Sequence, residues 1–483
     1  MKKILFTHSY FLRFDPKQWE TGLPYPPLGT MYAAACMREL GYEVELFDTM
    51  FSEQPEEIIF RLETMRPDYL VIYDDGFNYL TKMCLTNMRE AAFRMGKLAK
   101  AYGCKVIVSS SDSTDHYLQY IDEGADFIIM GEGELTLQEL IRTLDVHGTD
   151  LKSIEGLVFK NDANLVKTQK RNVIKDLDSL PMPAWDLIDI SPYRQSWLEN
   201  AGYFSLNMAT TRGCPFKCNW CAKPIYGNRY NSRSPQKVFD ELKLLKEKFQ
   251  FDHIWFCDDI FGLKPGWVHE FANLVEADGL RFKFKIQCRA DLLLQENYIM
   301  DLARAGCDNV WIGAESGSQK ILDAMDKGIT IDQIQTATAL LKKHKIHPSF
   351  FIQFGYPGET KEDIGKTIGM INRLLPHEIG ISVSYPLPGT VFFERVKDEL
   401  KEKSNWSDSD ELAIMFKNTY SPEFYKHLHR YVHAHFIRIK TLANFKAEFS
   451  YPKQMHSSHW IKMIKMPYYV ASELLYKYKL KYV

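Results

Sequence analysis

Short apolar segments alternate with longer amphipathic segments along most of this 483-residue chain, and this alternation restricts the fold more than any other feature. A run of about five apolar residues suits a buried strand, whereas a longer stretch with a 3.6-residue apolar period suits a helix. Strands separated by helices pair in parallel, because the chain must cross back over the sheet between them. The sequence therefore predicts an α/β protein.

The first series of alternating segments occupies residues 1–147. Its predicted strands are Lys3–Thr7, Glu43–Phe47, Tyr69–Tyr73, Lys105–Val108 and Asp126–Met130. Its predicted helices are Gly29–Leu40, Pro55–Met65, Tyr79–Tyr102, Asp115–Glu123 and Glu134–Leu144. Such repeats predict a doubly wound, Rossmann-like parallel sheet, which binds ligands at the carboxyl ends of its strands. No G-x-G-x-x-G follows the first strand, so a dinucleotide site is not expected.

A second series occupies residues 199–392. It follows a linker, 148–198, that holds a short hairpin and a proline-rich stretch at 180–186. The predicted strands are Tyr203–Thr210, His253–Cys257, Lys283–Gln287, Asn309–Ile312, Ser349–Phe354 and Ile379–Ser384. Six β-α units predict a partial (β/α)6 barrel of the TIM type, whose chemistry sits at the C-terminal ends of the strands. Residues 393–483 predict a mainly helical C-terminal region.

Composition excludes several classes of protein. The formal net charge is −2, which gives no general attraction to nucleic acid. The first residues lead straight into the first predicted strand without the apolar region of a signal peptide, and no apolar run approaches the ~20 residues of a membrane span. The nine cysteines do not form a secreted disulfide framework. We expect a cytoplasmic protein.

One loop gathers three of the cysteines. Cys214, Cys218 and Cys221 follow the first strand of the second series at C-x3-C-x2-C spacing, which lets their thiolates hold one soft metal centre. A structural zinc site needs a fourth ligand nearby, and the next Cys or His is His253. A four-iron cluster held by three thiolates keeps one iron open for another ligand. The spacing favours such an oxygen-sensitive cluster, with zinc and unrelated thiols as the alternatives.

The loop resembles that of radical S-adenosylmethionine (SAM) enzymes, including the aromatic residue just before the third cysteine. The resemblance implies a 4Fe-4S cluster on Cys214, Cys218 and Cys221, with SAM on its open iron. The implied SAM contacts are Trp220 and residues at successive strand ends, Asp258, Asp259, Arg289, Glu315, Ser316 and Gln353. Helix capping for the two aspartates, and a surface ion pair for the arginine, are the structural alternatives.

The first series resembles the cobalamin-binding domain that precedes many radical SAM domains. The resemblance implies cobalamin contacts at Pro27, Leu28, Gly29, Ser109, Ser110, Gly131, Glu132, Gly133 and Glu134. The D-x-H-x-x-G motif is absent, so no histidine of the protein is expected on cobalt, and serines stand where relatives read Gly-Gly-Pro-His. The Gly-Glu-Gly-Glu turn also suits an acidic loop that caps the next helix. Cys36, Cys84 and Cys104 allow a second cluster, although the first and third suit buried positions.

Within the radical SAM enzymes, the chain most resembles the cobalamin-binding branch, which contains the anaerobic magnesium-protoporphyrin monomethyl ester cyclase and cobalamin-dependent methylases. This resemblance has implications for function. It implies an anaerobic enzyme that cleaves SAM to a 5′-deoxyadenosyl radical and methylates an unactivated carbon of a small molecule. A flavodoxin or ferredoxin is the implied electron donor. A radical cyclase without methyl transfer and a non-catalytic cobalamin or redox sensor are the alternatives. No catalytic residue is assigned.

The C-terminal region carries two further features. Its four histidines at 427, 429, 433 and 435 suit packed or solvated helix faces better than a metal site. Relatives use this region to cover the barrel mouth. Its last stretch, residues 460–483, carries five lysines and one glutamate among apolar and tyrosine residues. Such a helix can lie on a membrane surface as a weak contact, or pack on its own protein with its lysine stems along the surface.

Overall fold

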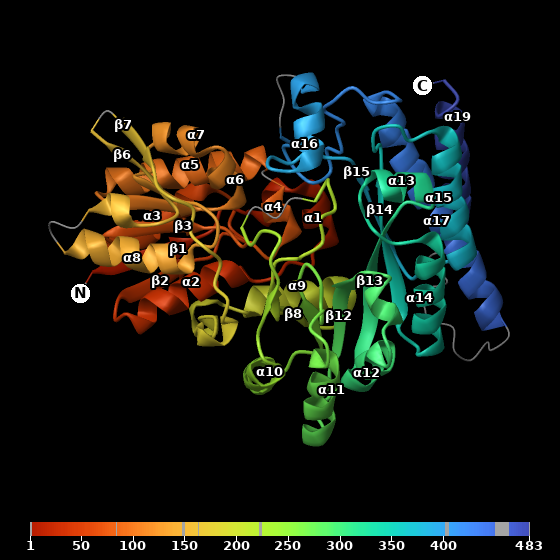
Figure 1. Ribbon diagram of the computed structural model, residues 1–483, viewed down its shortest axis with the longest axis horizontal. Coiled ribbons are helices and arrows are strands. Elements are labelled where there is room, and N and C mark those ends of the chain that lie inside the picture. Colours follow the sequence, from red (N-terminus) through yellow and green to blue (C-terminus); the bar gives the residue numbers. More distant parts are fainter. Residues whose placement is uncertain are drawn as a thin grey trace.

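The computed structural model of the chain describes residues 2–83, 85–146, 150–162, 164–221, 225–400, 405–449 and 463–482. Two sheets dominate it, and they lie side by side with the C-terminal helices on the far side of the second sheet (Figure 1). We call the seven-stranded sheet the first sheet and the six-stranded sheet the half-barrel.

The first sheet runs in the order β2-β1-β3-β4-β5-β6-β7. Its strands are β1 (Lys3–Thr7), β2 (Glu43–Phe47), β3 (Tyr69–Tyr73), β4 (Lys105–Ser109), β5 (Phe127–Ile129), β6 (Leu157–Asn161) and β7 (Asn164–Lys167). The first five strands are parallel in the flavodoxin-like order, which places a ligand crevice beside β1 and β3. The hairpin expected in the linker forms, but it extends this sheet because β6 pairs antiparallel with β5.

Helices cover both faces of the first sheet. They are α1 (Pro16–Thr21), α2 (Leu28–Glu39), α3 (Ile58–Met65), α4 (Tyr79–Lys82), α5 (Thr86–Ala101), α6 (Ser111–Asp115), α7 (Tyr117–Asp122) and α8 (Glu134–Asp145). Alternate strand residues enter two separate cores, one with α2 and α8 and the other with α3 and α5. The doubly wound prediction is confirmed. The helix predicted from Asp115 begins earlier, because Ser110 and Ser113 form a capping box that starts α6 at Ser111.

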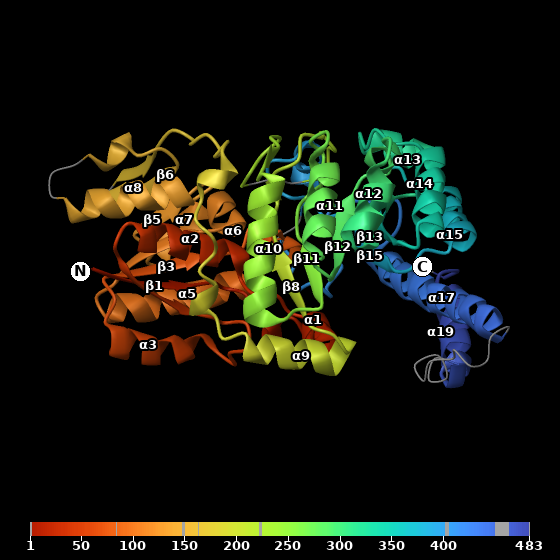
Figure 2. The same ribbon diagram turned by 90° about the horizontal axis from the view of Figure 1, so that it is seen from below.

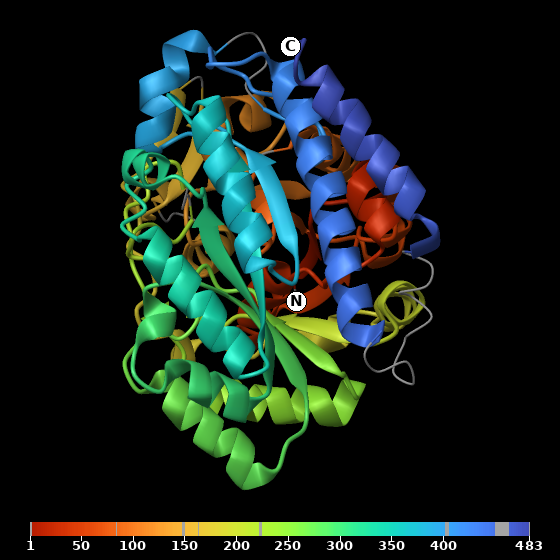
Figure 3. The same cartoon turned by 90° about the vertical axis from the view of Figure 1, so that its right-hand side faces the viewer.

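The half-barrel contains six parallel strands in sequence order, from β8 at one edge to β15 at the other. They are β8 (Ser205–Met208), β11 (His253–Phe256), β12 (Lys283–Cys288), β13 (Cys307–Glu315), β14 (His347–Phe354) and β15 (Ile379–Val383). The outer helices are α9 (Ser191–Ala201), α10 (Pro235–Phe249), α11 (Trp267–Asp278), α12 (Tyr298–Ala305), α13 (Gln319–Ala324), α14 (Ile331–Lys343) and α15 (Lys361–Leu374). Figure 3 shows the strands splayed into an open curl, which confirms the predicted partial barrel.

The C-terminal region is mainly helical, as predicted. It contains α16 (Val391–Val396), α17 (Pro422–Phe449) and α19 (Met466–Lys479). The long helix α17 contacts α15 and β15, and α19 packs along its outer side (Figures 1 and 2). Within the described residues, no helix combines the length and apolarity that a membrane span requires.

Candidate functional site

The cysteine loop leaves the half-barrel at the carboxyl end of its first strand. Just after β8, the short strand β9 (Thr211–Arg212) pairs with β10 (Asn231–Ser232) and closes the base of the loop. Cys214, Cys218 and Cys221 are all partly exposed, as ligands of an added cluster must be. Among the described residues, no three Cys, His, Asp or Glu side chains, these cysteines included, already converge on one point as metal ligands would.

Two cations face the cysteine loop. The Arg289 guanidinium stacks on Phe216 at 3.7 Å and places Nη1 4.0 Å from Cys218 Sγ. Burial lowers the pKa of Lys327, but the Glu315 carboxylate and the Cys218 thiol outweigh it and raise that pKa. Iron binds cysteine as the thiolate, whose negative charge these two cations would balance. The donor set and its surroundings therefore fit a cluster.

Asp258 holds the base of the loop. Its carboxylate accepts hydrogen bonds from the backbone N–H groups of Thr210 and Thr211, at 2.7 and 2.9 Å, and from the Thr210 hydroxyl at 2.5 Å. Burial raises its pKa to about 6. Its neighbour Asp259 forms an ion pair with Lys82 of α4, 2.7 Å away. The first aspartate thus positions the loop, and the second ties it to the first sheet.

Glu315 and Ser316 lie at the end of β13, where the strand bulges against β14. Glu315 adopts a left-handed conformation with φ of 56°, and its carboxylate pairs with Lys327 at 2.7 Å. The Ser316 hydroxyl lies 3.1 Å from Thr367 Oγ1 and accepts a hydrogen bond from the Ser318 N–H. A strained residue held by an ion pair at a strand end is a frequent feature of ligand sites.

Two other predicted SAM residues keep a polar atom unsatisfied. The amide nitrogen of Gln353 donates to Ser384 at 2.9 Å, while its oxygen Oε1 is buried without a partner in the described structure. The indole N–H of Trp220 is likewise buried and unpaired there. Arg289 differs, because its guanidinium is held by Asp291 and by the Lys327 carbonyl. A buried unpaired polar atom marks a place where a ligand or water completes the site.

The glutamates of the Gly-Glu-Gly-Glu turn face the cysteine loop. Glu132 and Glu134 clamp Arg212 at 2.5 and 2.7 Å, and all three side chains are almost fully buried. The guanidinium also lies over the rings of Tyr32, Phe77 and Tyr226, at 5.4, 5.6 and 5.3 Å. Arg212 stands two residues before Cys214, so this clamp fixes the cysteine loop to the first sheet. This clamp was not predicted from the sequence, because its partners lie about 80 positions apart.

The other predicted cobalamin residues form the carboxyl edge of the first sheet. Pro27 and Leu28 begin α2, and the Gly29 N–H donates to Asp75 Oδ1 at 3.1 Å. Ser109 ends β4, and Ser110 caps α6. His8, at the end of β1, is bound through its ring nitrogens to Asp48 and Thr49 and is not presented to a ligand.

At the carboxyl edge of the first sheet, two glycines face the segment that follows the cysteine loop and present no side chain to it. A Cβ on Gly76 would meet Ile225 Cδ1 at 2.7 Å, whereas Gly131 meets nothing closer than the Ile225 carbonyl at 3.7 Å. Gly133 differs, because a Cβ there would strike Ser109 Oγ of its own sheet at 2.8 Å. Ile225 therefore lies in a cradle made by Gly76 and Gly131.

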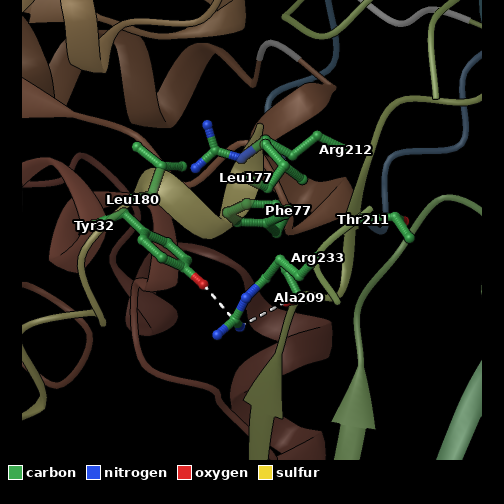
Figure 4. A pocket seen from close by; sticks show the side chains of 8 residues that line it. All are labelled: Tyr32, Phe77, Leu177, Leu180, Ala209, Thr211, Arg212 and Arg233. Atoms are coloured by element: carbon green, nitrogen blue, oxygen red, sulfur yellow. Dashed lines mark hydrogen bonds between the residues drawn. The ribbon is translucent and has the colours of Figure 1, made fainter. Parts of the chain in front are cut away.

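A small cavity lies beside the Arg212 clamp. It has a volume of about 10 Å³, room for about one water, and is lined by Tyr32, Phe77, Leu177, Leu180, Ala209, Thr211, Arg212 and Arg233 (Figure 4). The dashed lines in Figure 4 join Arg233 to the Tyr32 hydroxyl and the Ala209 carbonyl, both at 3.2 Å. A large ligand at this edge requires the segment at Ile225 to move.

Comparison with known proteins accounts for the half-barrel and its cysteine loop. Residues 208–371, from the end of β8 into α15, match the radical SAM superfamily. This part of the chain is a radical SAM domain. A radical SAM domain is that of an enzyme and binds a 4Fe-4S cluster and SAM. The cysteine spacing favoured the cluster, and the resemblance implied SAM.

Relatives align beyond the radical SAM domain. An uncharacterized methyltransferase of Pyrococcus horikoshii is 28% identical over 392 residues, which cover 80% of this chain and 82% of the relative. The anaerobic magnesium-protoporphyrin IX monomethyl ester cyclase of Synechocystis sp. is 26% identical over 325 residues, which cover 66% of this chain and 63% of the cyclase.

Solved structures share the whole fold. The cobalamin-dependent S-adenosylmethionine radical enzyme OxsB, solved with aqua-cobalamin and S-adenosylmethionine bound, superposes with a TM-score of 0.75 at 16% identity. The match covers 99% of this chain and 72% of OxsB. The arrangement of first sheet, half-barrel and helical C-terminal region is therefore that of OxsB.

Proposed function

We propose that this radical SAM enzyme is a cobalamin-dependent methyltransferase that acts on an unactivated carbon of a small molecule. The observation that carries the proposal is the Arg212 clamp. It joins the Gly131–Glu134 turn, at the predicted cobalamin edge, to the loop that holds the cluster cysteines. Two cofactors that exchange a methyl group and a radical with one substrate must lie close together. A clamp between the turn and the cysteine loop supports such an arrangement.

The residues present fit both sites. Cobalamin, when bound, supplies a methyl carrier, and the reduced cluster supplies the electron that cleaves SAM. Around the cluster, Arg289 and Lys327 hold positive charge beside Cys218. In the barrel interior, Gln353 Oε1 and Trp220 Nε1 offer an acceptor and a donor for SAM or substrate. At the first sheet, the cradle of Gly76 and Gly131 accepts a flat ligand once Ile225 moves aside.

The relatives support this assignment. One aligns over most of its length and is described as a methyltransferase, and the fold is that of a cobalamin-dependent radical enzyme. The likeness to the magnesium-protoporphyrin monomethyl ester cyclase favours a second candidate, a radical cyclisation without methyl transfer. An electron donor such as flavodoxin or ferredoxin would reduce the cluster in either case.

The test uses anaerobically reconstituted protein with SAM, hydroxocobalamin and a chemical reductant. A methyltransferase should form S-adenosylhomocysteine that depends on cobalamin, together with 5′-deoxyadenosine that depends on the cluster. The Cys218→Ala variant should lose the second product and serves as the matched control. Formation of 5′-deoxyadenosine alone would favour the cyclase, and the absence of both products from fully loaded protein would overturn catalysis.

A further inference from the structure

Helix α19 has two chemically different faces. Its inner face packs on α17, where Glu473 bonds to His435 at 3.0 Å and to Arg438. The Tyr476 hydroxyl accepts a hydrogen bond from Arg430 at 3.2 Å. Glu473 is the one acidic residue of α19, so the contact with α17 uses all of the negative charge on this helix.

The outer face of α19 is apolar and exposed. One side of the helix, and of the turn that ends it, carries Tyr468, Leu475, Tyr478 and Tyr482. These residues follow one another at spacings of seven, three and four, which place side chains on the same side of a helix. Their exposed fractions are 69%, 48%, 58% and 73%, and Ile464 and Leu474 beside them are exposed by 77% and 62%. We call these six residues the outer stripe. Single exposed apolar residues are ordinary, whereas a continuous stripe marks an interaction surface.

Lysines border the outer stripe on both sides. By their helical spacing, Lys477 and Lys481 lie along one border and Lys465 and Lys479 along the other, and all four are exposed. The described residues of this face include no carboxylate. The outer face of α19 is therefore both apolar and locally positive, although the formal net charge of the whole chain is −2.

We propose that the outer stripe of α19 docks on an anionic lipid bilayer. Apolar side chains enter the boundary of the acyl region, lysines reach lipid phosphates, and tyrosines suit the headgroup level. Charge complementarity selects a bilayer, because an interface with a second copy would bring the lysine rows of both copies together. In Figures 1 and 2, α19 lies at the margin of the molecule, outside α17 and away from both sheets. The docking therefore leaves the carboxyl edges of both sheets free, and it does not depend on the proposed reaction.

Flotation with vesicles tests the proposal on the full-length protein. Phosphatidylcholine vesicles that contain phosphatidylglycerol should carry the protein upward, vesicles of phosphatidylcholine alone should not, and added salt should weaken the binding. The triple variant Lys477→Gln/Lys479→Gln/Lys481→Gln should lower the partition coefficient by roughly 100-fold, from the contribution of each surface lysine. The double variant Leu475→Gln/Tyr478→Gln should lose binding while its net charge stays the same.

The control removes the same charge elsewhere. Lys152, Lys248 and Lys343 are exposed and lie outside the C-terminal region, so Lys152→Gln/Lys248→Gln/Lys343→Gln should float like the unaltered protein. Melting temperature and circular dichroism confirm that every variant is folded. Equal losses in the two triple variants would overturn the proposal, as would a protein that never floats. A dimer that dissociates in the double variant, without vesicle binding, would assign the outer stripe to a second copy.

Discussion

The carboxyl edge of the first sheet and the interior of the half-barrel differ in how their buried polar groups are satisfied. At the first sheet, Asp74 is bonded to Ser9, Asp75 is bonded to Gly29, and the two glutamates of the turn hold Arg212, although Glu134 Oε2 stays buried without a partner among the described residues. In the half-barrel and its cysteine loop, unpaired buried atoms remain among the described residues, on Trp220, Asn309, Ser349 and Gln353.

We infer from this difference which kind of ligand each region suits. An unpaired buried polar atom costs free energy that a polar ligand or a water recovers. Gln353 Oε1, near the carboxyl end of β14, and Trp220 Nε1, in the cysteine loop, therefore suit a polar molecule such as SAM, whereas Asn309 and Ser349 lie near the opposite ends of their strands. The first sheet instead offers glycine backbone, aromatic rings and carboxylates that are mostly engaged within the protein, which suit a large ligand held by shape. The predictions below test this contrast.

The largest expected effect is the loss of the cluster. Replacement of Cys214, Cys218 and Cys221 by alanine should abolish the iron-sulfur absorption of reconstituted protein, because it removes all three proposed thiolate ligands. The double variant Cys36→Ala/Cys104→Ala is the control, since both cysteines are buried in the first-sheet layer. Full iron and sulfide content in the triple variant would show that the metal binds elsewhere. Cys84 lies outside the described residues.

The second effect is a loss of stability at the Arg212 clamp. The variant Arg212→Met should lower the free energy of unfolding by about 3–5 kcal/mol, because two buried carboxylates lose their cation. Arg38→Met is the matched control, since it breaks the exposed pair with Asp186 and should cost at most about 1 kcal/mol. Urea unfolding of the cluster-free protein measures both. Equal losses would mean that the clamp is no stronger than a surface pair.

Neutral glutamines offer a further check on this clamp. Adding Glu132→Gln and Glu134→Gln to Arg212→Met should recover part of the lost stability, because no buried charge then stays unpaired. If the combined variant is as unstable as Arg212→Met, packing rather than charge explains the loss.

The third effect is a dependence of stability on pH at Glu359, a buried carboxyl after β14. Burial raises the pKa of Glu359 to about 8 from its ordinary 4.5. The folded protein then keeps a proton that the unfolded chain releases, so stability falls as pH rises from about 4.5 to about 8, by up to about 1.4 kcal/mol per unit. Glu359→Gln should flatten this fall in urea unfolding at pH 6 and 8, and Glu362→Gln on the exposed start of α15 should not. An unchanged slope in Glu359→Gln would assign the dependence to other carboxyls.

Much of the fold is predictable because its signals are local. The strands β1, β2 and β3 match their predicted bounds to the residue, since each is a short segment rich in apolar residues with a helix after it. The cysteine loop is equally local, with three ligands within eight residues. Arg212 and Lys327 were missed because their partners are set by the packing of distant elements. The addition of β6 and β7 to the first sheet was missed for the same reason, because a hairpin carries no sign of the edge it joins.

The smallest expected effect is a change in SAM affinity that distinguishes a residue in contact with SAM, Gln353, from a residue that stabilises the half-barrel, Ser316. Gln353→Met keeps the side-chain length but removes the unpaired Oε1, so it should weaken SAM binding by about two- to tenfold, the contribution of one hydrogen bond. Ser316→Ala removes a hydroxyl that already bonds to Thr367 and Ser318, so it should lower the melting temperature and leave SAM affinity nearly unchanged. Both are measured on folded, cluster-loaded protein by equilibrium dialysis with labelled SAM. If Ser316→Ala weakens SAM binding more than Gln353→Met does, the end of β13 contacts SAM directly, and the unpaired amide oxygen serves water or substrate instead.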